Sequence, residues 1–336
     1  MSQNLDKPFK TLDEQLELLK NRNLIISDDN FAKHALSTFS YYDLINGYKD
    51  YLMPNDVFIP GVTIEYLYYL FLLDKSIQSV IVKYSLIIEN YFKNQFAYQI
   101  SFKYGVQHHD YLNHIHYNEN ASGITFQQHI IGELAFLFNT SSSRNPTKHY
   151  LINHNHIPPW ILFKNISLGT SINFFKLLKT NDKATIANIL IPSTTIDVKQ
   201  KIELLIRGLD GLKEFRNYSA HNLNFVSCSI PKPLPLKLLY KLIPGALYMN
   251  GNQIIQVDKK SCKRLYGAIL SIILILNNPY LKSLFINDLL LAINNPQLLD
   301  DSKLLYGLVS DYCQLAQLPS NFISRLKTIL ESLPNN

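Results

Sequence analysis

An arginine and a histidine, Arg216 and His221, stand five positions apart in the stretch that runs from Phe215 to Asn222. The arginine is permanently charged, whereas the histidine gains or loses its proton near neutral pH. The pair suits chemistry on a phosphodiester, because the guanidinium can hold the non-bridging oxygens while the imidazole moves a proton to or from a ribose hydroxyl or a leaving oxygen. Asn217 and Asn222 lie in the same stretch and could orient a phosphate or a base.

The spacing of this pair is not specific by itself, because a chain with 6 arginines and 10 histidines readily contains such a pair by chance. In the alternative interpretation, Arg216 forms an ion pair with a nearby carboxylate such as Glu214, and His221 is an ordinary surface histidine. The elements that position the two residues therefore decide which interpretation the chain supports.

The residues before the pair have the periodicity of a helix that faces a core. The apolar positions are Ile202, Leu205, Ile206, Leu209, Leu212 and Phe215. We expect Thr194 with Asp197 to open this helix. On an ideal helix the side chains of Arg216 and His221 would point in directions about 140° apart around the helix axis. The helix could instead end near Ser219, which would leave His221 in the following turn.

A second carboxylate of interest, Glu89, follows a dense apolar run inside a long helical territory at residues 63–104. We expect at least one break in this territory, near Asp74. A carboxylate is costly to bury unless it is paired. Glu89 is therefore either a buried partner for a charged group or an exposed residue near Lys93.

Four stretches carry a resemblance to a known family. They are Lys7-Pro8-Phe9 with the run from Thr11 to Leu19 and with Asn23-Leu24-Ile25-Ile26, the box Tyr41-Tyr42-Asp43-Leu44-Ile45-Asn46-Gly47-Tyr48-Lys49, Pro158-Pro159-Trp160 with Leu168-Gly169-Thr170, and the R-x4-6-H pattern of Arg216 and His221. Together they resemble the Abi-type abortive-infection family in its AbiD/AbiF-like form, within the HEPN superfamily of α-helical ribonucleases. The resemblance covers about residues 5–230. Asp43 stands where many relatives have arginine, and Asn222 stands where many have a second histidine.

The resemblance implies a metal-independent endoribonuclease of anti-phage defence, in which the 2′-hydroxyl of the RNA attacks the adjacent phosphate. In such an enzyme His221 would be the general base or acid and Arg216 would stabilise the charged transition state. A carboxylate in the place of Glu89 could orient either of them. The resemblance also implies a homodimer without metal or cofactor, restrained by a small structured non-coding RNA. Two other functions stay open: a non-catalytic RNA-binding module, and an interaction scaffold that senses a phage component.

The charge of the chain suits a polyanionic partner. The net charge is +6, and residues 144–216 contain 11 Lys and Arg against 5 acidic residues, which equals the whole excess. A local basic excess favours RNA as a partner, although an ordinary solvated helical surface would also account for it. The lysines that we expect to contact RNA are Lys164, Lys176, Lys179 and Lys213.

The remaining chain predicts a mainly α fold. We expect an N-terminal helical region at residues 1–58, a HEPN-like helical core at 59–230, and a C-terminal helical extension at 231–336 with a short β-hairpin near 246–257, where Asn250-Gly251 stands between apolar runs. Residues 160–178 are expected to form one helix, and the serine-rich residues 139–145 a mobile loop.

The sequence also indicates where in the cell the protein acts and whether it binds a metal. The polar residues that open the sequence lead us to expect no signal peptide. The apolar run at residues 265–276 is too short to span a membrane and predicts a buried helix. Three widely spaced cysteines, Cys228, Cys262 and Cys313, form neither a disulfide framework nor a zinc pattern. The histidine-rich residues 105–120 lack the regular frame that fixes a metal. We therefore expect a cytoplasmic protein that binds neither a metal nor a membrane.

Overall fold

The computed structural model describes residues 7–121, 124–125, 130–138, 146–294 and 302–334. Helices make up most of these residues, with two hairpins of two strands each. This confirms the prediction of a mainly α fold. The serine-rich stretch at 139–145 lies outside the described residues. None of the helices in the described ranges is long and apolar enough to cross a membrane.

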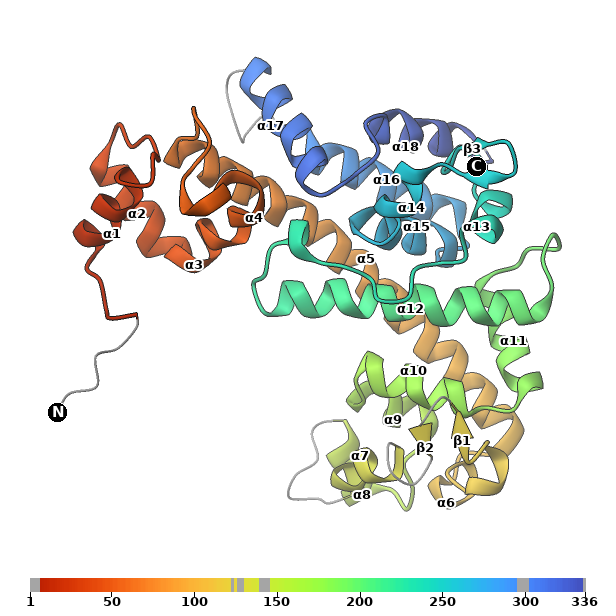
Figure 1. The fold of residues 1–336 in the computed structure, drawn as a ribbon. Coiled ribbons are helices and arrows are strands. Elements are labelled where there is room, and N and C mark those ends of the chain that lie inside the picture. The colour runs from red at the N-terminus through yellow and green to blue at the C-terminus, as the bar shows by residue number, and fades with distance from the viewer. Residues whose placement is uncertain (1–6, 122–123, 126–129, 139–145, 295–301, 335–336) are drawn as a thin grey trace.

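The longest helix, α5 (Ile64–Tyr104), has 41 residues and runs diagonally through the molecule (Figure 1). Thr63 caps its first turn, and Gly105 ends it with a φ of 82°, a conformation that glycine adopts without steric cost. The prediction of a break near Asp74 is wrong. The side chain of Asp74 is fully buried and accepts hydrogen bonds from other parts of the chain, so the helix continues through this polar residue.

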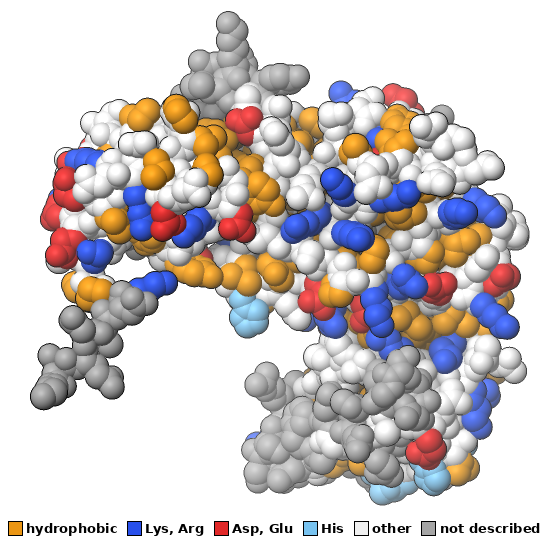
Figure 2. Space-filling model, viewed as in Figure 1, with side chains coloured by type: hydrophobic (Ala, Val, Ile, Leu, Met, Phe, Trp, Pro, Cys, Tyr) orange, Lys and Arg blue, Asp and Glu red, His pale blue; other side chains and the backbone are white. Residues whose placement is uncertain are grey.

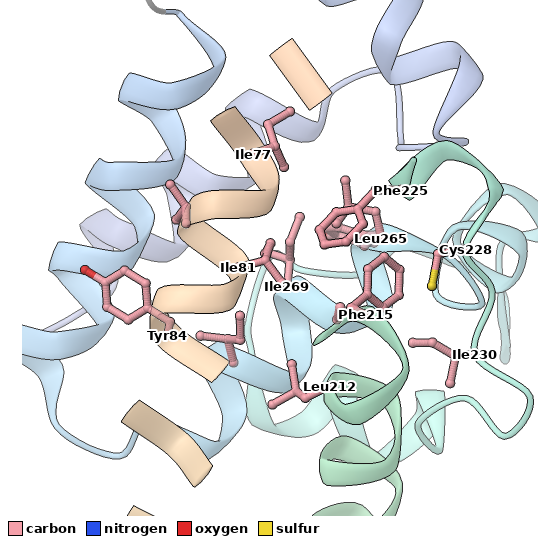
Figure 3. Packing of buried hydrophobic residues seen from close by; sticks show 14 of the residues in the cluster. Ile77, Ile81, Tyr84, Leu212, Phe215, Phe225, Cys228, Ile230, Leu265 and Ile269 are labelled. Atoms are coloured by element: carbon pink, nitrogen blue, oxygen red, sulfur yellow. The ribbon is translucent and has the colours of Figure 1, made fainter. Parts of the chain in front are cut away.

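The helix that carries the Arg–His pair is α12 (Val198–Ala220). Asp197, and not Thr194, accepts the hydrogen bond from Gln200 that caps it. Its apolar face packs against α5 and against α15 (Leu265–Ile275), in which every residue is buried, as the apolar run predicted. Figure 3 shows Leu212 and Phe215 of α12 in the same core as residues of α5 and α15. This core fixes the direction in which α12 ends.

The N-terminal helices lie at one end of α5 (Figure 1). The capping box that Thr11 and Glu14 predicted is present at α1. The box at residues 41–49 is broken into short pieces, and it packs against α5 and against the segment that follows α12. The elements are α1 (Leu12–Lys20), α2 (Asp29–Phe39), α3 (Tyr41–Leu44), η1 (Asn46–Tyr48), α4 (Lys49–Leu52) and η2 (Pro54–Asp56).

Short elements gather around the other end of α5. Residues 160–178 do not form the single helix that we predicted, because Ser167 accepts a hydrogen bond from the amide of Thr170 and so begins a new helix. The elements are α6 (His108–Tyr111), η3 (His114–His116), β1 (Asn120–Ala121), β2 (Ile124–Thr125), α7 (Gly132–Leu134), η5 (Ala135–Phe138), α8 (Thr147–Asn153), α9 (Pro159–Asn165), α10 (Leu168–Leu177) and α11 (Thr180–Leu190).

The C-terminal part packs directly on α5 and α12. The predicted hairpin is present: β3 (Met249–Asn250) pairs antiparallel with β4 (Gln253–Ile254), and Gly251 between them has a φ of 57°. The other elements are η6 (Phe225–Ser227), α13 (Leu236–Leu242), α14 (Gln256–Ser261), α16 (Pro279–Ile293), α17 (Ser302–Leu315) and α18 (Phe322–Glu331). The division into three regions at residues 58 and 230 stays a prediction.

Candidate functional site

Arg216 and His221 lie at the C-terminal end of α12. The helix ends at Ala220, and His221 caps it by donating its backbone N–H to the carbonyl of Asn217 at 3.0 Å. The second of our two expectations for this helix is therefore the observed one. Asn217 and His221 are exposed, and the Arg216 side chain is 34% exposed. In the described part of the chain the imidazole of His221 makes no hydrogen bond or ion pair, so it is open to a ligand.

This end of α12 faces open space on the outside of the molecule. Figure 2 shows a broad hollow between the N-terminal helices and the part of the chain around α6 to α10, and the end of α12 lies at the rim of this hollow (Figure 1). An extended ligand could therefore reach the pair without any movement of the core.

Glu89 is the carboxylate that holds Arg216. Its side chain is 11% exposed, and its two oxygens lie 3.4 Å from Arg216 Nε and 2.7 Å from Lys93 Nζ. The contact with Arg216 is an ion pair without a well-aligned hydrogen bond. The alternative partner, Glu214, pairs with Lys213 at 3.2 Å. Because Glu89 engages Nε, the two terminal nitrogens of the guanidinium, which have no partner among the described residues, are left for a ligand.

Lys93 connects this ion pair to the end of α9. Its ammonium donates to the carbonyl of Ile166 at 2.6 Å as well as to Glu89. Burial lowers the pKa of Lys93, the hydrogen bond and the charge of Glu89 oppose that change, and the charges of Arg216 and Lys164 add to it. Two cations thus pair with one carboxylate and Lys164 lies near Lys93, so this neighbourhood has a positive balance that suits an anion.

The loop after His221 is fixed by α3 and α5. Asn222 has a φ of 58°, a left-handed conformation that asparagine tolerates at the end of a helix. Its side-chain amide donates to Asp43 Oδ2 at 2.9 Å, and its carbonyl accepts from Lys75 at 3.1 Å. The Asn222 side chain therefore holds the loop in this structure. Asp43 and Asn222, the two positions that depart from the resembling family, contact each other.

Two polar residues of α5 that we did not single out as site residues complete this support. Gln78 donates to the carbonyl of Leu223 at 2.9 Å and to Asp74 at 2.7 Å, and it accepts from Ser219 at 3.2 Å. Asp74 accepts from the backbone of Phe225 at 3.0 Å and from Tyr312 at 2.6 Å. Polar residues four positions apart inside an apolar run are the signal that could have identified them.

Gly47 lets the N-terminal box approach this loop closely. The side chain of Asn224 is buried and donates to the carbonyl of Asp43 at 3.1 Å. A Cβ on Gly47 would lie 1.7 Å from Nδ2 of Asn224. The close approach therefore requires glycine, and the box supports the loop that follows the Arg–His pair.

We expect Gly47→Ala to lower the free energy of unfolding by about 1–3 kcal/mol, because the methyl group overpacks the contact with Asn224. Denaturant unfolding of the purified variant measures the change. Gly169→Ala is the matched control, because a Cβ there meets its nearest atoms at 3.5 Å inside a helix, where alanine stabilises by roughly 0.5–1 kcal/mol. Equal stability of the two variants would contradict the role given to Gly47.

The four lysines expected to contact RNA occupy different environments. Lys164 lies beside the site and donates to Asn90 at 3.3 Å. Lys176 pairs with Asp210 at 3.1 Å, and Lys213 pairs with Glu214. Lys179 donates to the carbonyl of Ile115, away from the pair. RNA contact by these residues stays a prediction, with Lys164 best placed for it.

The histidines of residues 105–120 make stacking contacts and ion pairs with neighbouring side chains. His116 stacks on Tyr104 with a centroid distance of 4.1 Å, His108 packs against His109, and His114 pairs with Glu119 at 3.0 Å. Within the ranges that the structure describes, no group of three or more His, Cys, Asp or Glu side chains is arranged to hold a metal ion.

Comparison with protein-family models shows which family the chain is similar to. A protein-family model described as Abi-like protein matches residues 34–226, which is more than half of the chain. The matched region contains the box at 41–49, Glu89 and the Arg–His pair. No curated protein and no solved structure matches the chain.

Proposed function

Because the chain belongs to the Abi-like protein family, whose proteins act in abortive infection against phage, we propose that it is a metal-independent endoribonuclease of the HEPN type. One observation carries the proposal: a buried carboxylate pairs with Arg216 through Nε in the last turns of a packed helix, and His221 is exposed directly where that helix ends. The AbiD/AbiF-like resemblance of the box at residues 41–49 supports the same assignment.

The proposed reaction uses the RNA as its own nucleophile. The 2′-hydroxyl loses its proton to a base, its oxygen attacks the adjacent phosphorus, and the 5′-oxygen leaves with a proton from an acid. Arg216 holds the non-bridging oxygens, where negative charge grows in the transition state. His221 performs one of the two proton transfers. The products are a 2′,3′-cyclic phosphate and a 5′-hydroxyl, and no metal takes part in the chemistry.

One imidazole performs only one of the two proton transfers. A homodimer that brings two Arg–His pairs together would supply a second imidazole for the other transfer. A free ribonuclease would also harm its host, so we propose a small structured non-coding RNA as the restraining partner, bound through the basic part of the surface. Light scattering of the purified protein, with absorbance recorded for nucleic acid, measures both features. A fully active monomer, or a protein free of RNA and without affinity for RNA, would contradict them.

The ends of the RNA products test the reaction directly. We expect cleaved RNA to carry a 2′,3′-cyclic phosphate and a 5′-hydroxyl, and we expect cleavage to continue in excess chelator. The mechanism has no route to other ends, because the attacking oxygen belongs to the RNA. Products with a 3′-hydroxyl and a 5′-phosphate would overturn it.

One observation favours a second candidate, a non-catalytic RNA-binding module. No group among the described residues fixes the tautomer of the His221 ring, as the partner of a catalytic histidine often does. In that case Arg216 and His221 only contact phosphate. Arg216→Ala would then weaken RNA binding, and the unmodified protein would show no cleavage.

A further inference from the structure

The chain carries a second concentration of positive charge, after the Arg–His pair. Residues 221–287 contain eight Lys and Arg and a single acidic residue, Asp258. Asp258 is fully buried and pairs with Arg325 at 2.8 Å, so its charge is already used inside the protein. Figure 2 shows Lys and Arg side chains gathered over α13, α14 and the adjoining part of α12.

Four of these residues form what we call the C-terminal basic cluster: Lys232, Lys260, Lys263 and Arg264. The backbone brings them together, because the amide of Ile230 donates to the carbonyl of Lys263 at 2.8 Å. Arg264 donates to the carbonyls of Ser227 and Cys228 at 3.3 and 3.4 Å. Lys232, Lys260 and Lys263 are exposed, and none of the four makes an ion pair with any described residue.

This cluster differs from three basic residues of α10 and α12. There, Lys176, Lys213 and Arg207 pair with Asp210, Glu214 and Glu203. An ion pair on the surface cancels most of the field that a polyanion would sense. These three charges are therefore partly cancelled, whereas the four charges of the cluster are not. Lys164 and Lys179 also make no ion pair with a described residue, but their ammonium groups donate to Asn90 and to the carbonyl of Ile115. The partial negative charge at the C-terminal end of α14 offsets only about half an elementary charge of the cluster's positive charge.

The cluster also lines a hollow. A depression of about 520 Å³ is bounded by Lys260, Lys263 and Arg264 together with Val257, Ser261, Gln317 and Leu318. Three cations at one hollow give a place for phosphate oxygens, since Lys and Arg are the side chains that neutralise nucleic-acid phosphates.

The cluster lies close to the candidate site. Arg264 contacts the segment directly after η6, and its charge opposes the rise that burial causes in the pKa of Tyr218. Tyr218 belongs to the last turn of α12, three positions before His221. One extended strand could thus lie across both surfaces.

We propose that the C-terminal basic cluster is a second phosphate-binding surface, which holds the RNA backbone beside the phosphate that Arg216 and His221 engage. The inference rests on the proposed function, because it takes RNA as the ligand. Residues 231–336 would then anchor the RNA, while α12 presents the reacting groups.

The test compares two double variants that remove the same charge. K260Q/K263Q changes the cluster, and K7Q/K10Q removes two exposed lysines from the opposite end of the chain. The probe is a fluorescent single-stranded RNA with 2′-O-methyl groups, which cannot be cleaved through its own 2′-hydroxyl. Affinity is measured over a range of salt concentrations, and thermal unfolding confirms that both variants are folded.

We expect K260Q/K263Q to weaken binding about tenfold near physiological salt and to lower the salt slope by about 1.4, since each contact with a single strand contributes about 0.7. K7Q/K10Q should bind like the unmodified protein. If both variants bind equally, the inference is wrong while the proposed function stands. If the unmodified protein does not bind the RNA at all, both are wrong. Cleavage of a dinucleotide, too short to reach the cluster, should be equal in all three proteins.

Discussion

Replacing His221 by alanine is expected to slow RNA cleavage by roughly 10²–10⁴-fold, the usual contribution of a positioned acid or base. His221 is exposed and its ring makes no hydrogen bond or ion pair within the described ranges, so the substitution should leave the fold intact. Its effect on the free energy of unfolding should stay within about 0.5 kcal/mol. Cleavage of a labelled RNA by the purified variant, measured as a single-turnover rate, gives the change.

A control separates the chemistry from a general effect of surface substitution. Asn217→Ala alters another exposed side chain at the end of the same helix, and it should cost much less than His221→Ala, because an amide cannot transfer the proton. A His221→Ala protein that cleaves at the rate of the unmodified protein would remove His221 from the mechanism.

Replacing Asp74 by alanine is expected to lower the free energy of unfolding by about 3–5 kcal/mol. The carboxylate accepts from Tyr312, from Gln78 and from the backbone of Phe225, and the substitution leaves all three donors without their acceptor in the interior. Burial raises the pKa of Asp74, and these three donors oppose the rise. The bonds connect α5, α17 and the loop after His221, so their loss should also disorder the site.

Denaturant unfolding measures this change, and Tyr312→Phe is the matched control. It removes one of the three hydrogen bonds and keeps the ring, so it should cost only about 1 kcal/mol. If Asp74→Ala is no less stable than Tyr312→Phe, then the hydrogen bonds to Gln78 and Phe225 do not support the loop as the structure indicates.

The sequence was most informative where local chemistry decides the structure. The apolar periodicity before Phe215 and the buried run of α15 depend on neighbouring residues, and both are confirmed. The start of α12 was predicted only in part, because Asp197 caps the helix without Thr194. Glu89 could be identified as a candidate because a carboxylate after an apolar run needs a partner. Whether that partner was Arg216 or only Lys93 depended on how α12 crosses α5, and the structure places both beside it.

The predictions that were wrong or incomplete depended on contacts between distant parts of the chain. Asp74 was interpreted as a break in α5, because two of its three donors come from residues about 150 and 240 positions away, and only Gln78 is a neighbour in the sequence. Similarly, the charge count along residues 144–216 could not show which lysines pair with carboxylates. Pairing depends on tertiary contacts: Lys176 and Lys213 pair with carboxylates, whereas the four residues of the C-terminal basic cluster make no ion pair with a described residue.

The central claim is that the end of α12 forms a ribonuclease site. Growth and bulk RNA integrity in cells that express the protein alone, beside His221→Ala at matched abundance, test this most directly. We expect growth arrest with RNA breakage in the first case and neither in the second. Equal behaviour of the two proteins, with RNA still bound to both, would contradict the claim and favour the RNA-binding module.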